Sequence, residues 1–217
     1  MYVNVNMTKS DLLSKYFNLS IPTFRYVHKH LMNCGRLILD IGCSVGNYLD
    51  LLPKGSIGID IDMNSLRLCV AKGFKVVCAD TDYPLPFRDA SVDGVLASHI
   101  LEHVRSPIAF LEEVHRILKS DGVLVIGLPV EGGIASYKLQ YFKGHRGARG
   151  HLYSFSLDNI DELLFLTGFK KPIFFFHIAK IGYKRKLMYL CDFLQRVLPS
   201  SVLFKLSSAY WAVTFKK

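Results

Sequence analysis

Three aspartates and two glycines form the pattern with the clearest chemical meaning. Asp40 lies in the apolar run LILDIG, before a turn that contains Gly42 and Gly46, whereas Asp60 and Asp80 end the next two apolar runs. A carboxylate at a strand end can accept hydrogen bonds from both hydroxyls of a ribose, and a glycine turn lets a ligand approach the backbone. Aligned strand-end acids predict a ligand site at the carboxyl edge of a parallel sheet. A packing turn with solvated acids is the structural alternative.

The glycine turn argues against a dinucleotide cofactor. The segment GCSVG has the form G-x-x-x-G and lacks the G-x-G-x-x-G spacing that binds a pyrophosphate. A nicotinamide-dependent oxidoreductase is therefore a distant alternative.

Short apolar runs alternate with helical patterns through the first 130 residues. We expect strands at Arg36–Ile41, Ser56–Asp60, Lys75–Ala79, Val92–Ser98 and Gly122–Leu128. We expect helices before the first strand, at Ser10–Phe17 and Pro22–Asn33, and between strands, ending near Leu52 and spanning Asn64–Lys72 and Pro107–Leu118. This alternation predicts an α/β fold with a Rossmann-like, doubly wound, mostly parallel sheet.

The remaining chain predicts a helix and two strands around an insert. The helix is expected at Asp158–Thr167 and the strands at Pro172–Ile178 and Ala209–Phe215, with the helical insert Ala179–Ser208 before the last strand. We interpret 1–217 as one domain, with N-terminal helices over 1–35, a cofactor-binding core over 36–133, and a basic substrate-side part over 134–217.

Five motifs in order resemble those of class I methyltransferases, most closely the methyltransferase type 11 group. They are LDIGCSVGNYL, GIDID, CADTDYPLPF, SVDGVLASHILEHV and LEEVHRILKSDGVLVIGLP. The resemblance covers Leu37 to Pro129 and extends more loosely through HLYSFSLDNIDELLFLTGF. It implies a methyltransferase whose cofactor is S-adenosylmethionine.

The resemblance also assigns residues to that cofactor. Those implied at its methionine end are Asp40, Gly42, Cys43, Ser44, Gly46 and Ser98. Those implied along its ribose and adenine are Asp60, Ile61, Asp80 and Thr81. At Ser44 the family usually has glycine. A serine fits there if the backbone keeps a negative φ, so we expect cofactor binding to be retained, although more weakly.

Histidines are the candidates for a general base, which a hydroxyl or amine acceptor can require. The resemblance puts His99 near the transfer site and His151 on the substrate side, and both are our catalytic candidates. His103, on an expected helix after the fourth strand, fits a structural role as well as a catalytic one. No histidine pair has metal-binding spacing, so we expect no metal.

The composition indicates a globular protein without an evident membrane span. Hydrophobic residues make up 50% and charged residues 21% of the 217 residues. No apolar run reaches the roughly 18 residues of a spanning helix, and the N-terminus lacks secretory-signal features, which favours a cytoplasmic protein. The five cysteines fit reduced core residues; they are Cys34, Cys43, Cys69, Cys78 and Cys191.

The net charge of +9 lies entirely in the C-terminal part. Residues 134–217 carry 14 Lys and Arg against 4 Asp and Glu, which favours an anionic partner. Within 134–151, basic residues are interleaved with tyrosines. This mixture suits a segment that binds a phosphorylated, sugar or nucleic-acid substrate, and a solvated loop is the alternative interpretation. The insert 179–208 combines cations with an apolar stripe, which fits core packing, a homodimer contact or peripheral membrane binding.

We therefore expect methylation, at oxygen, of a small-molecule, glycan or lipid-linked acceptor. One alternative is an RNA or tRNA methyltransferase, favoured by the basic half. Another is a non-catalytic binding protein that retains the fold, although such a protein need not keep three strand-end acids.

Overall fold

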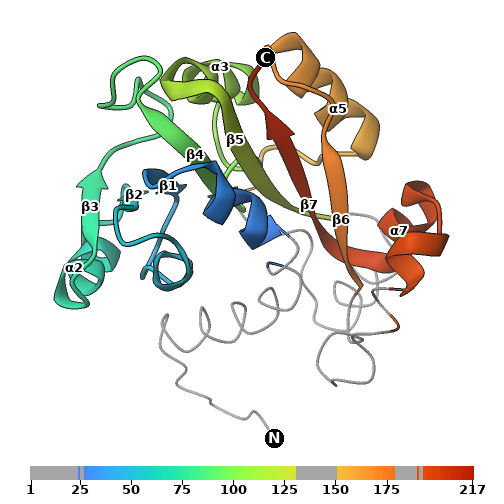
Figure 1. Ribbon diagram of the computed structural model, residues 1–217, viewed down its shortest axis with the longest axis horizontal. Helices are drawn as coiled ribbons and strands as arrows, with labels where there is room; N and C mark the ends of the chain where they lie inside the picture. Colours follow the sequence, from blue (N-terminus) through green and yellow to red (C-terminus); the bar gives the residue numbers. More distant parts are fainter. Residues whose placement is uncertain (1–23, 25–26, 131–150, 179–189, 191–192) are drawn as a thin grey trace, which may run out of the picture.

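A seven-stranded sheet forms the centre of the protein (Figure 1). The computed structural model of the 217-residue chain describes residues 24, 27–130, 151–178, 190 and 193–217. The strands are β1 (Ile38–Ile41), β2 (Ile57–Asp60), β3 (Lys75–Cys78), β4 (Val92–Ser98), β5 (Leu118–Pro129), β6 (Ile173–Ile178) and β7 (Ser207–Phe215). Their order is β3-β2-β1-β4-β5-β7-β6, and β7 runs antiparallel to both of its neighbours. This confirms the predicted α/β fold.

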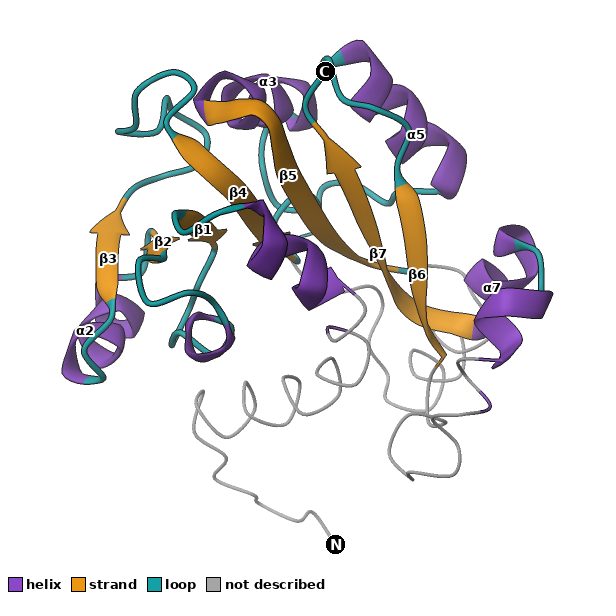
Figure 2. Cartoon of the chain, viewed as in Figure 1, coloured by secondary structure: helices purple, strands orange, loops and turns teal. Residues whose placement is uncertain are grey.

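Helices cover both faces of the sheet (Figure 2). They are α2 (Met63–Ala71), α3 (Pro107–Ile117), α5 (Leu157–Leu166) and α7 (Ser200–Leu206), with the helical residues 27–34 and the 3-10 turn η1 (Leu49–Leu51). Alternate strand residues divide the core, since successive side chains point to opposite faces. Leu39 and Val95 pack in one cluster with α3 and α5, whereas Ile38 and Leu96 pack in the other with residues 27–34 and α2.

Two expected helices are wrong, and a following proline explains both. The segment ending near Leu52 forms only the 3-10 turn η1, because Leu52 precedes Pro53 and is extended. The helix expected to carry His103 is a series of turns. Ser106 precedes Pro107, adopts φ −133° and ψ 100°, and caps α3 instead of continuing a helix.

Other differences are smaller. The strand β5 begins four residues before its expected start, and its first residue pairs with Val92 next to a β-bulge. Cys43 and Cys69 are buried as expected, but Cys78 is exposed at the outer strand β3, so it is not a core residue. The expected helix Ser10–Phe17 and most of 179–192 lie outside the described residues. Within the described chain, no helix is both long and apolar enough to span a bilayer.

The described end of the insert packs on the sheet. Leu203 of α7 is buried, and Leu194 and Leu198 pack against the same cluster. The same segment also exposes Phe193 and Val197, each 58% accessible. Core packing is therefore confirmed for the inner side of this segment.

Gly127 of β5 contacts both the residue after β4 and the buried Trp211 ring. Its carbonyl oxygen accepts a hydrogen bond from the His99 N–H at 2.9 Å, and a Cβ at this position would lie 2.7 Å from the Trp211 ring. An added methyl group has no room against a rigid indole.

We expect Gly127→Ala to lower the free energy of unfolding by about 1–3 kcal/mol, because overpacking displaces the indole. Denaturant unfolding at constant m-value measures the loss. The matched control is the same change in a Trp211→Leu background, where the loss should shrink. An equal loss in both backgrounds would exclude the ring as the cause.

Candidate functional site

The turn after β1 is held by main-chain contacts to β2. The N–H groups of Gly42 and Cys43 both donate to the Ile59 carbonyl, at 2.7 and 2.9 Å. The turn continues with φ +76° at Gly42 and +80° at Gly46, conformations that favour glycine. The backbone of this turn is therefore fixed against the end of β2.

The two glycines also have packing reasons. A Cβ on Gly42 would lie 2.0 Å from Ile100 Cδ1, and one on Gly46 would lie 3.0 Å from Cys69 Sγ. Gly42 thus allows the loop after β4 to contact the turn after β1. The packing turn considered from sequence is real, and it is compatible with a ligand site on the other side of the backbone.

Ser44 differs from the expectation for its backbone. Its φ is +48°, not negative, and its N–H donates to Asp60 Oδ2 at 2.8 Å. A serine in the left-handed region costs roughly 1 kcal/mol relative to glycine, so this hydrogen bond helps to offset the strain.

Asp60 ends β2 and organises the backbone around it. Besides Ser44, it accepts a hydrogen bond from the Asp62 N–H at 2.9 Å through Oδ1. Each carboxylate oxygen can accept a second hydrogen bond, so a ribose role is compatible with this geometry. Ile61 follows with 64% of its surface exposed, which suits a side chain that packs on a flat ligand.

The other predicted cofactor residues lie at the same edge. Asp80 and Thr81 follow β3, and Asp80 Oδ1 accepts the Asp82 N–H at 3.0 Å. Ser98 ends β4. Because β1, β2, β3 and β4 are parallel neighbours, their carboxyl ends meet at one edge of the sheet, as predicted.

Asp40 is a buried acid with one carboxylate oxygen that lacks a hydrogen-bond partner among the described residues. It is 1% exposed, and that oxygen is Oδ2. Burial, with a smaller effect of Asp60, raises the pKa of Asp40 to about 7. A cationic group nearby would stabilise its charged form. The sulfonium and ammonium groups of S-adenosylmethionine are such cations, so the residues fit the cofactor that the sequence predicts.

The loop after β4 brings a histidine and a glutamate together. His99 Nδ1 lies 3.1 Å from Glu102 Oε1; the glutamate is fully buried, whereas 46% of the histidine side chain is exposed. His99 has φ +56°, a strained conformation of the kind that clusters at functional sites. His103 and His151 lie beside this pair, with ring centroids 4.7 Å apart.

Two neighbouring residues were missed from sequence. Glu102 was hidden inside the motif HILEHV, although its position between two histidines was a signal. His177, in the apolar strand β6, is 7% exposed; burial, with a smaller contribution from His99, lowers its pKa to about 4. The basic segment 134–150 lies outside the described residues.

Comparisons with known proteins agree with this geometry. A family described as "Methyltransferase domain" matches residues 39–126. A malonyl-[acyl-carrier protein] O-methyltransferase of Marinomonas sp. is 26% identical over 142 residues, 61% of this chain and 52% of that protein. A tRNA (carboxymethyluridine(34)-5-O)-methyltransferase of Arabidopsis thaliana is 34% identical over 96 residues, 42% of this chain and 24% of that protein.

A solved structure supports the fold over most of the chain. A SAM-dependent methyltransferase from Archaeoglobus fulgidus superposes with a TM-score of 0.68 at 22% identity, covering 96% of this chain and 100% of that one. By contrast, this chain spans 39% to 45% of the length of several curated relatives that it matches.

Asp40 should make cofactor binding depend on pH. The cationic end of the cofactor should favour the ionised form of Asp40. The affinity for S-adenosylmethionine should therefore rise as the pH rises through 7, where Asp40 loses its proton, and level off above it. The change is at most about tenfold per pH unit below that value. Isothermal titration calorimetry between pH 6 and 8.5 measures it.

The control is Asp40→Asn, which should bind more weakly at pH 8 and lose most of the pH dependence. An unchanged pH profile in this variant would show that another group causes it.

Proposed function

Because residues 39–126 belong to the methyltransferase domain family, we propose that this chain transfers a methyl group from S-adenosylmethionine to an oxygen atom of a small or lipid-linked acceptor. The pairing of His99 with the buried Glu102, beside the cofactor edge of the sheet, carries the proposal. Two of the relatives are named as methyltransferases that act on oxygen.

The bound cofactor would supply an electrophilic methyl group on a positively charged sulfur. In the proposed site, Asp40 would face the cationic end of the cofactor and Asp60 its ribose hydroxyls. Ile61 would lie against the adenine, Asp80 would accept a hydrogen bond from the adenine amino group, and the Thr81 N–H would lie beside it. The turn after β1 is fixed against the end of β2 before a ligand binds, which lowers the entropic cost of alignment.

His99 is proposed as the general base. Its Nδ1 hydrogen bond to Glu102 favours the tautomer with the proton on Nδ1, which leaves Nε2 able to accept one. His99 Nε2 would accept the proton of the acceptor hydroxyl while that oxygen bonds to the methyl group supplied by the cofactor, whose sulfur would keep the electron pair of the broken methyl–sulfur bond. His151, from the segment before α5, is proposed to face the acceptor.

Two features support the proposed acceptor class: the basic C-terminal part and the exposed residues of the insert. An anionic acceptor suits the excess of cations in 134–217, and exposed Phe193 and Val197 suit a lipid surface. An RNA acceptor remains the alternative, favoured by the same charge and by the tRNA-modifying relative. Cosedimentation with anionic vesicles at low salt and gel shift with tRNA distinguish these two classes.

The first test is cofactor binding by thermal shift. S-adenosylmethionine and S-adenosylhomocysteine should raise the melting temperature, whereas NAD should not. A ligand at one hundred times its dissociation constant adds about 2.7 kcal/mol to the free energy of unfolding. Asp60→Ala should lose the shift. Asp161→Ala, at a partly exposed position on α5, serves as the control and should keep the shift. No shift with either adenosyl compound would favour a binding-only protein.

The second test is the base. His99→Asn should lower kcat by about 10² to 10⁴, measured as S-adenosylhomocysteine released with an accepted substrate, while the thermal shift stays unchanged. His115→Asn is the matched control, because His115 lies in the last turn of α3 at the opposite edge of the sheet. Equal rates for the two variants would exclude His99 as the base.

A further inference from the structure

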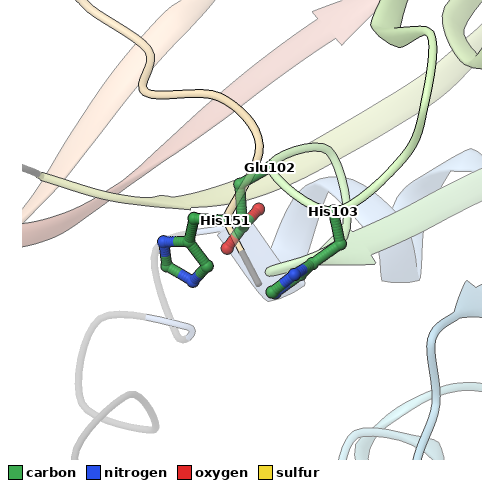
Figure 3. A group of neighbouring side chains, drawn as sticks. All are labelled: Glu102, His103 and His151. Carbon is green, nitrogen blue, oxygen red and sulfur yellow. The ribbon is translucent and has the colours of Figure 1, made fainter. Parts of the chain in front are cut away.

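A glutamate and two histidines converge near the end of β4 (Figure 3). One ligand atom from each of Glu102, His103 and His151 lies within 4.8 Å of the other two. Glu102 and His103 come from the loop after β4, whereas His151 precedes α5. The three side chains thus join two segments that are far apart in the sequence.

Main-chain hydrogen bonds hold these two segments together. The Leu152 N–H donates to the Glu102 carbonyl oxygen at 2.8 Å, and the Tyr153 N–H donates to the same oxygen at 3.4 Å. The Tyr153 hydroxyl donates to the Arg105 carbonyl at 2.8 Å. Because His151 directly precedes Leu152, these main-chain hydrogen bonds keep His151 close to Glu102.

The charge of Glu102 points to a missing positive partner. The residue is fully buried, and its Oε1 already contacts His99. Its Oε2 is buried without a hydrogen-bond partner among the described residues. A buried carboxylate with an unsatisfied oxygen is costly, and a bound cation would offset that cost.

We propose that Glu102, His103 and His151 bind one divalent transition-metal ion, with Zn²⁺ as the ion that this ligand set favours. Two imidazole nitrogens and one carboxylate form the protein ligands of zinc sites that keep an open coordination position. Magnesium and calcium prefer oxygen ligands, which makes them poorer fits. His103 is exposed and His151 is partly exposed, so the site is accessible from solvent.

The role of the ion rests on the proposed function, although its binding does not. An ion at this position would hold the acceptor oxygen near His99. It would also lower the pKa of an acceptor hydroxyl, as zinc does for bound water. The sequence predicted no metal because its histidines lack local metal spacing, whereas this site depends on a contact across 48 residues.

Metal binding is tested with tag-free protein and no S-adenosylmethionine. Cobalt(II), a spectroscopic substitute for Zn²⁺, should give visible absorption that saturates at one ion per chain, and calorimetry should give the same stoichiometry for Zn²⁺. Glu102→Gln, His103→Ala and His151→Ala should each weaken binding at least tenfold. His115→Ala, outside the cluster, should bind as the wild type does.

Circular dichroism shows which variants fold, and exposed His103 gives the variant least dependent on core packing. No cobalt absorption in the wild type, or equal affinity in folded His103→Ala, would overturn the site. Chelation should lower kcat at least tenfold without changing the S-adenosylmethionine thermal shift, and an unchanged kcat would overturn the catalytic role. A failed thermal shift would instead refute the proposed function and leave the metal titration interpretable.

Discussion

The parallel pairing of β1 with β4 is the constraint on which the site depends. Ile41 lies opposite Ala97, so both strands end at the same level of the sheet. The turn after β1 and the loop after β4 therefore meet, and only a glycine at position 42 leaves room for Ile100 between them. Proposed cofactor residues and the histidine cluster are neighbours because these two strands are neighbours.

Burial of acids at this edge gives the site its electrostatic character. Asp40 and Glu102 are both buried, and each has one carboxylate oxygen without a hydrogen-bond partner in the described chain. Asp60, by contrast, accepts two main-chain hydrogen bonds and stabilises the turn. A folded protein keeps such uncompensated acids at a cost in stability, and sites for cationic ligands are where this cost is regained on binding.

Sequence predicted the parallel strands and the strand-end acids well, because a buried strand reads as a short apolar run bounded by turn residues. The predicted helices were wrong in two segments between strands, where the residues before Pro53 and Pro107 are extended and the chain forms turns. Sequence also could not find the contact of His151 with Glu102, which depends on main-chain hydrogen bonds between distant segments. The positive φ of Ser44 was missed because the strain is offset by Asp60, a partner 16 residues away.

The position of β7 imposes an order on assembly. In the described sheet, β6 pairs with β7 alone, and β7 lies between β6 and β5. On a growing chain, β6 is made first yet has no strand to join until β7 has followed. Its run of three phenylalanines, Phe174–Phe176, thus stays unpaired during synthesis, and such apolar segments are prone to aggregate. The strand order thus leaves an apolar strand open to wrong pairing until the last strand of the sheet has been made.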